Sequence, residues 1–231
     1  MTALVANSRL RPGQLASTLR RTQVDGLGFV DRLKTHYRPY LCPFGELLDL
    51  IHDGEHVFDI GCGSGQFALL AASFARPGRI SGIEISPRLV ANADALFARA
   101  AIKIPHAFSV YDGIAFPPAL AAADVVFLID VLHHVPPARQ HEFLKDLHRT
   151  MRPGARLIVK DIDAASPLVV FNRLHDRVFS GARGHEWPAG KLAGTLHDTG
   201  FDVNALHRQT TWVYPHYLCV ATKLSAISPS A

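Results

Sequence analysis

The sequence predicts an α/β fold in which a doubly wound, mostly parallel sheet carries helices on both faces. Short apolar strands alternate with helical segments along most of the chain, and a glycine-rich turn joins the first of these strands to a helix. The apolar run at 125–129 shows no alternation, which is typical of a strand buried on both faces of a parallel sheet.

The size and charge of the chain limit its domain organisation and its possible partners. The chain has 231 residues, 48% of them hydrophobic, and a formal net charge of +4. This length suits one sizeable core, so we expect a helical N-terminal extension, residues 1–52, that helps to cover the active site, and one domain, residues 53–231. Residues 1–40 carry seven Arg and Lys against two Asp. Such an excess does not by itself indicate nucleic-acid binding; it suits a solvated face or a surface for an acidic partner.

The three cysteines, Cys42, Cys62 and Cys219, are scattered and form no Cys-x-x-Cys pair. They predict neither a disulfide framework nor a metal site and suit a reducing compartment. No apolar run approaches the ~20 residues of a membrane span, and no apolar segment follows the first positive charges as in a secretory signal. We therefore expect a cytoplasmic protein.

The N-terminal extension is predicted to be mainly helical. Residues 1–25 suit a loose arm or a short helix, and residues 26–51 suit helices interrupted at Pro39 and Pro43. Four apolar residues recur at helical spacing and should face the core: Phe44, Leu47, Leu48 and Ile51.

The remaining elements follow in alternation. Strands are expected at 56–60, 79–85, 107–111, 124–129, 156–160, 201–207 and 214–222. Helices are expected at 67–74, 87–101, 137–151 and 189–198. Ser86 and Pro87 favour a helix start, and the short connection between the last two strands permits antiparallel pairing. Residues 164–187 suit an inserted lid.

Acidic residues fall at or just after the ends of four predicted strands: Asp59, Glu84, Asp112 and Asp130. Right-handed crossovers bring the carboxyl ends of parallel strands to one edge, where the ligands of such sheets bind. We therefore expect a ligand site at this edge.

The turn from Gly61 to Gly65 could serve two classes of cofactor. It lets the backbone approach a ligand and aims free helix amides at it. Dinucleotide enzymes use Gly-x-Gly-x-x-Gly with an acid about 20 residues later. Glu84 satisfies that spacing, but Gln66 stands where the third glycine belongs. An NAD(P)-dependent oxidoreductase is thus the lower-ranked alternative, and the chain has no Tyr-x-x-x-Lys pair.

The segment 57–65 resembles the first motif of class I S-adenosylmethionine-dependent methyltransferases. Further segments resemble later motifs of that family, in order: 82–87, 111–117, 127–135 and 147–158. This resemblance, to the small-molecule type, covers about residues 56–163. It implies a Rossmann-like seven-stranded sheet with an antiparallel C-terminal strand, S-adenosylmethionine as cofactor and S-adenosylhomocysteine as product.

The resemblance also implies roles for individual residues. The glycines should line the methionine moiety, Glu84 should accept both ribose hydroxyls, and Asp112 should accept the adenine amine. Asp112 could instead serve a turn, and Asp130 could cap the following helix. The expected cofactor contacts are Asp59, Gly61, Cys62, Gly63, Gly65, Glu84, Ile85, Asp112, Gly113 and Asp130.

Methyl transfer depends on in-line positioning, and a hydroxyl acceptor also profits from a base. The catalytic candidates are His133, His134 and His185, with Asp161 and Tyr37 as further possible bases. His133 and His134 could instead serve packing and loop geometry. The residues expected at the acceptor are Tyr37, Arg38, Phe171 and Trp187.

The acceptor is expected to be small and hydrophobic or aromatic, either free or bound to an acidic carrier protein. Apolar residues of the insert suit such a pocket or the core of a lid: Leu168, Val169, Val170, Phe171, Phe179 and Trp187. O-methylation is favoured because potential bases surround the edge. Asp130 to His133 lack the Asn/Asp-Pro-Pro-aromatic motif of base-amine methyltransferases. A cofactor-binding subunit without turnover is a further alternative.

Overall fold

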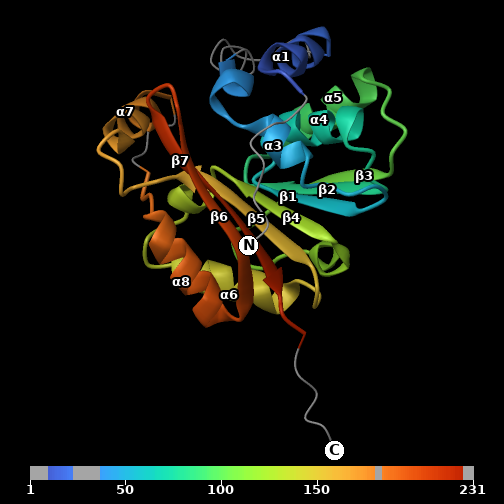
Figure 1. The fold of residues 1–231 in the computed structure, drawn as a ribbon. Helices are drawn as coiled ribbons and strands as arrows, with labels where there is room; N and C mark the ends of the chain where they lie inside the picture. Colours follow the sequence, from blue (N-terminus) through green and yellow to red (C-terminus); the bar gives the residue numbers. More distant parts are fainter. Residues whose placement is uncertain (1–9, 23–36, 180–183, 226–231) are drawn as a thin grey trace, which may run out of the picture. The chain divides into compact units, whose positions relative to one another are not determined.

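The computed structural model describes residues 10–22, 37–179 and 184–225, with only the backbone described for residues 175–179. The described residues fold into two compact units: those up to residue 115, the N-terminal unit, and those from residue 116 onward, the C-terminal unit. Seven strands form a sheet in the order β3-β2-β1-β4-β5-β7-β6 (Figure 1). This order, with helices between most successive strands, confirms the predicted α/β class.

The N-terminal unit contains three parallel strands. They are β1, His56–Ile60, β2, Arg79–Glu84, and β3, His106–Val110. Its helices are α1, Pro12–Arg21, α3, Phe44–Leu48, α4, Gln66–Phe74, and α5, Pro87–Arg99. Every residue of β1 is buried, so the glycine turn that follows this strand starts from a fixed position.

The N-terminal extension packs within this unit. Leu15, Ala16 and Leu19 of α1 are buried, and α1 contacts α4. The predicted apolar face is confirmed, because four residues are less than 10% exposed: Phe44, Leu47, Leu48 and Ile51. The interruption predicted at Pro39 is wrong. Pro39 lies in a helical stretch at 37–41, where the bond from the Cys42 amide to the Arg38 carbonyl remains intact at 2.8 Å.

The C-terminal unit contains four strands. They are β4, Val125–Ile129, β5, Arg156–Ile162, β6, Phe201–Thr211, and β7, Tyr214–Lys223. Strand β4 pairs with β5 in parallel, whereas β7 runs antiparallel to both β5 and β6. The antiparallel C-terminal pairing is therefore confirmed. Strand β5 extends two residues beyond its predicted end because β7 continues to pair with it, placing Asp161 opposite Tyr217 and Ile162 opposite His216.

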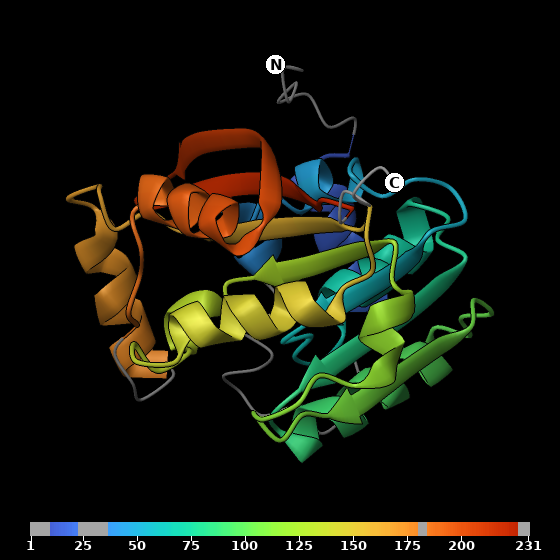
Figure 2. The ribbon, with the colours of Figure 1, turned by 90° about the horizontal axis from the view of Figure 1, so that it is seen from below.

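The helices of this unit are α6, Gln140–Thr150, α7, Val169–Phe179, and α8, Ala189–Thr199, with 3-10 turns η1, Pro118–Ala122, and η2, Leu132–His134. Helices α6 and α8 lie side by side against the sheet (Figures 1 and 2). Helix α6 begins at Gln140, later than predicted, because a turn from the Arg139 amide to the Pro136 carbonyl precedes it. No helix within the described ranges is long and apolar enough to cross a membrane.

Candidate active site

The glycine turn after β1 has the backbone geometry of a ligand-binding loop. Gly61, Gly63 and Gly65 have φ values of 72°, 54° and 76°, a region that side-chain-bearing residues rarely adopt. A Cβ on Gly65 would lie 3.0 Å from that of Ala93, so glycine lets α4 and α5 approach closely. A Cβ on Gly63 would meet nothing within 4 Å. The loop therefore packs closely against α5 at Gly65, whereas free space adjoins the Cα of Gly63.

Glu84, the last residue of β2, lies beside this loop. Its Oε2 accepts a hydrogen bond from the Gly63 amide at 3.1 Å, and its Oε1 accepts one from the Ser86 amide at 3.1 Å. Two backbone amides therefore fix the carboxylate, which retains lone pairs for further donors. The next side chain, Ile85, is 71% exposed. A fixed carboxylate followed by an exposed apolar side chain fits the cis-diol and the flat base of a nucleoside.

Asp59 is a buried carboxylate at the end of β1, only 3% exposed. Burial raises its pKa from an ordinary 3.8 to about 7; the charge of Arg38 opposes this rise and that of Glu84 adds to it. Burial, with help from Asp59, also raises the pKa of the Cys62 thiol far above its usual range. Cys62 is therefore a neutral packing residue at neutral pH, whereas Asp59 can respond to a nearby ammonium group.

Replacing Asp59 with Asn is expected to stabilise the ligand-free protein more at pH 8 than at pH 5. Because the folded-state pKa lies above the unfolded value, the stability from the protonated carboxyl is complete below about pH 3.8 and lost by about pH 7. At roughly 1.4 kcal/mol per pKa unit, the total is on the order of 4 kcal/mol. Melting curves of both proteins at the two pH values would measure it, and a gap that does not widen with pH would contradict the assignment.

Asp112 and Gly113 follow β3 on the exposed surface of the N-terminal unit. Asp112 Oδ1 accepts hydrogen bonds from the amides of Ile114 at 2.8 Å and Ala115 at 3.3 Å, and Gly113 has a φ of 80°. Asp112 thus has the turn role that its sequence also suggested. The contact expected between these residues and adenine remains a prediction.

In the C-terminal unit, Asp130 follows β4 and forms an ion pair with a buried lysine, a pairing that was not predicted from the sequence. Lys160 Nζ donates to Asp130 Oδ1 at 2.5 Å, and the lysine side chain is 4% exposed. Asp130 has a φ of 56°, an unusual backbone state for a residue with a side chain. The detectable signal was a lysine at the end of the apolar segment 157–159, which predicts a buried charge needing a partner.

His133 and Asp161 form a second buried pair at the same edge of this unit, with side chains 3% and 2% exposed. His133 Nδ1 lies 2.5 Å from Asp161 Oδ1, which also accepts the Ile162 amide at 2.7 Å. Asp161 Oδ2 accepts the amide of His133 itself at 3.2 Å. The carboxylate thus selects the tautomer with the proton on Nδ1, and Nε2 of the neutral ring is then the basic nitrogen.

The remaining catalytic and acceptor candidates of the C-terminal unit differ in how far their side chains are exposed. His134 is exposed, with its ring centroid 4.0 Å from that of His133. His185 is also exposed, but its amide donates to the His133 carbonyl at 2.8 Å. Phe171 on α7 is 45% exposed, whereas Trp187 is 6% exposed.

Two predicted acceptor contacts, Tyr37 and Arg38, are half-buried in the helical stretch of the N-terminal unit. Much of the basic segment 1–40 lies outside the described residues, as does the side chain of Phe179. The structure thus brings His133, Asp161 and the His185 backbone together within the C-terminal unit.

His216 is a further buried residue that the sequence did not single out. It lies opposite Ile162 on β7 and is 0% exposed, and neither ring nitrogen has a hydrogen-bond partner in the described part of the chain. Burial and the charge of Lys160 lower its pKa to about 4, against smaller opposing effects of Asp130 and the Tyr214 backbone. It is therefore neutral at physiological pH. The sequence gives no sign of this environment, because a single histidine in an apolar strand looks the same whether or not its ring nitrogens have hydrogen-bond partners.

A glycine turn beside a fixed carboxylate, on a sheet of this strand order, defines the class of S-adenosylmethionine-dependent methyltransferases. A family profile described as a methyltransferase domain matches residues 33–206, so the chain belongs to this methyltransferase family.

Individual relatives agree with this assignment. The chain is 34% identical to 27-O-demethylrifamycin SV methyltransferase of Amycolatopsis mediterranei, across 47% of this chain and 39% of that protein. It is 30% identical to O-methyltransferase rstn1 of Aspergillus nomiae across 69% of each. Several of the most similar curated relatives are matched over only 39 to 56% of their own length.

Solved structures share the fold. The magnesium protoporphyrin IX methyltransferase of Synechocystis, solved with bound S-adenosylhomocysteine, aligns with a TM-score of 0.64 at 22% identity. The alignment covers 90% of this chain and 93% of the other. At this identity the likeness concerns the fold alone.

Proposed function

We propose that the chain transfers a methyl group from S-adenosylmethionine to a hydroxyl oxygen of a small acceptor, and that His133 removes the hydroxyl proton. The observation that carries this proposal is the buried pair of His133 and Asp161 at the end of β4 and β5. A neutral imidazole held by a carboxylate at Nδ1 suits a general base at Nε2. Several relatives are named O-methyltransferases, which supports an oxygen acceptor.

The cofactor-holding residues are proposed mainly from the N-terminal unit. Glu84 would accept the ribose hydroxyls, the loop from Gly61 to Gly65 would hold the methionine end, and Asp59 would attract its ammonium group. Ile85 would pack on the adenine, and Asp112 and Gly113 would bond its edge. Cys62 and Asp130 complete the proposed set. When bound, S-adenosylmethionine supplies an electrophilic methyl group on a sulfonium.

His133 is preferred to the other two histidines because a carboxylate orients it. Asp161 bonds to the His133 ring through Nδ1 and accepts the His133 backbone amide, so one carboxylate holds both the ring and the backbone that carries it. In this role Asp161 is a positioning residue, and it stabilises the imidazolium that forms as the acceptor proton moves to Nε2. His134 and His185 would then shape the surroundings of His133.

The acceptor is proposed to be hydrophobic or aromatic. Val170, Phe171 and Leu174 expose 58%, 45% and 61% of their surface on α7, and such an apolar group suits a ligand-facing wall. Trp187, Tyr37 and Arg38 are further proposed contacts. For a carrier-bound acceptor, Arg38→Ala should slow transfer to the carrier-bound form more than to the free acid. Equal rates of methyl transfer to the free and the carrier-bound acceptor, with no change in Arg38→Ala, would contradict a carrier-bound acceptor.

Isothermal titration separates the proposed cofactor from the dinucleotide alternative. S-adenosylhomocysteine is expected to bind the full chain with a measurable heat, whereas NAD at the same concentration is expected to give none. Gln66 in place of the third glycine is the reason, because it removes the close approach that a pyrophosphate needs. Binding of NAD without binding of S-adenosylhomocysteine would reverse the assignment.

A further inference from the structure

The C-terminal unit contains a pocket of about 340 Å³ whose two cations, Arg173 and Lys191, have no role in the proposed methyl transfer. It is lined by the start of α6, by α7, by the segment 184–187 and by the first turn of α8. Its polar side chains are Gln140, Arg173, His185, Glu186 and Lys191. The volume is at the lower end of the range for small-molecule sites. We refer to it as the Arg173–Lys191 pocket.

A buried carboxylate fixes one cation of this pocket. The Glu186 side chain is 0% exposed, and it accepts hydrogen bonds from Arg173 Nε at 3.1 Å and from Asn172 Nδ2 at 3.2 Å. The Arg173 side chain remains 35% exposed. Since Nε supplies only one of the five N–H donors of a guanidinium, the others can bond a ligand. Glu186 thus compensates one charge and holds Arg173 in position.

A tryptophan ring holds the second cation. Lys191 Nζ lies 3.9 Å from the centroid of the Trp187 ring, whose other neighbour is the His141 ring at 4.8 Å. Within the described residues, no carboxylate lies within ion-pair distance of Lys191. The ring attracts the ammonium but does not neutralise it. Arg173 and Lys191 together therefore carry one positive charge more than Glu186 offsets.

The pocket is joined to the loop that carries the proposed base. Gln140 Nε2 donates to the carbonyls of Leu132 and His185, both at 2.9 Å. The His185 amide in turn donates to the His133 carbonyl at 2.8 Å. The segment that lines the pocket and the turn that carries His133 are therefore one hydrogen-bonded assembly.

We propose that the Arg173–Lys191 pocket binds an anionic oxygen group, a phosphate or a carboxylate, on a part of the acceptor remote from the methylated hydroxyl. Two cations from separate elements suit such a group, because charge-assisted hydrogen bonds are stronger than neutral ones. The binding energy of this non-reacting anionic group would then help to hold the acceptor hydroxyl in position for methyl transfer. The link to the acceptor rests on the proposed function; anion binding itself does not.

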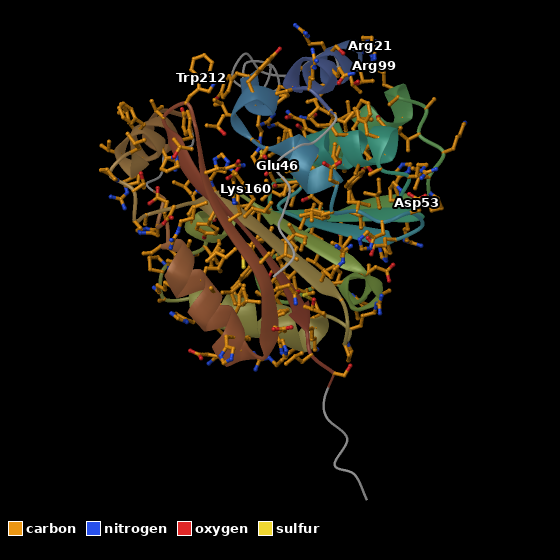
Figure 3. All side chains as sticks on the ribbon, viewed as in Figure 1. Arg21, Glu46, Asp53, Arg99, Lys160 and Trp212 are labelled. Carbon is orange, nitrogen blue, oxygen red and sulfur yellow. The ribbon has the colours of Figure 1, made fainter. Side chains whose placement is uncertain are left out.

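The two tryptophans of the chain allow a direct test. Trp212, at the tip of the β6–β7 hairpin, is 82% exposed (Figure 3), so Trp212→Phe leaves Trp187 as the sole tryptophan reporter. Inorganic phosphate and benzoate would each be titrated into this protein, with chloride keeping the ionic strength constant. A saturable change in Trp187 fluorescence is expected, since an anion must alter the contact between Lys191 and the ring. The stronger of the two probes identifies the preferred group.

Matched variants in the same background decide the outcome. Lys191→Met keeps the apolar stem and is expected to raise the half-saturating concentration at least about tenfold, whereas Lys191→Arg should retain binding. Lys145→Met, at an exposed lysine on α6, should bind like the parent. No saturable response to either probe, or an unchanged response in Lys191→Met, would overturn the proposal. S-adenosylhomocysteine binding, measured separately, keeps this result distinct from a failure of the proposed function.

Discussion

His133→Ala is expected to lower kcat for methyl transfer by about 10²- to 10⁴-fold, the usual contribution of a general base. The affinity for S-adenosylhomocysteine should change little, because the proposed cofactor contacts lie mainly in the N-terminal unit. Steady-state kinetics, with the acceptor that labelled transfer identifies, would measure the first quantity and isothermal titration the second. A loss of both would indicate a structural role for the buried ring.

The pH profile separates a base from a packing residue. In the wild type, activity should fall at acid pH as the imidazole becomes protonated, and His133→Ala should lose this acid limb. Asp161→Asn should lower kcat as well, because an amide NH₂ next to Nδ1 favours the wrong tautomer. His197→Ala, at an 82% exposed histidine on α8, is the matched control and should keep wild-type kinetics. Full activity in His133→Ala would show that His133 is not the general base.

Glu84→Ala is expected to weaken S-adenosylhomocysteine binding by about 10²- to 10⁴-fold, because hydrogen bonds to a charged group contribute roughly 1.5–3 kcal/mol each and two are lost. The variant also releases the Gly63 and Ser86 amides that the carboxylate holds. Glu84→Gln, which keeps one acceptor oxygen, should give a smaller loss. Isothermal titration measures all three proteins.

A control tests whether the effect of Glu84 is local. Glu142→Ala removes a half-exposed carboxylate of α6 that pairs with Arg149 on the surface, and its binding of S-adenosylhomocysteine should equal that of the wild type. If Glu84→Ala binds this ligand as tightly as the wild type does, the ribose assignment is wrong.

The fold was predictable from the sequence because its signals are local. The apolar run of β4 and the Ser-Pro start of α5 lie at or within one residue of their predicted places. The strand ends that were predicted wrongly depend on pairing with strands far away in the sequence. Strand β5 ends at Ile162 only because β7 pairs with it up to His216, and no pattern within residues 156–162 contains that information.

The candidate site divides in the same way. The motif residues Gly63 and Glu84 were predicted, and the bond between them follows from the pairing of adjacent strands. The ion pair of Asp130 with Lys160 and the contact of His133 with Asp161 join residues 30 and 28 positions apart. Both depend on which residue of β5 stands at the strand end, so the sequence could supply the candidates but not their pairing.

Transfer of a labelled methyl group tests the central claim most directly. Cell extract would be incubated with methyl-labelled S-adenosylmethionine and the wild-type chain, His133→Ala or Glu84→Ala, and the products examined by mass spectrometry. We expect one labelled small molecule with the label on an oxygen, abundant with the wild type and strongly reduced with either variant. No labelled product with the wild type, or a product formed equally by His133→Ala, would contradict it.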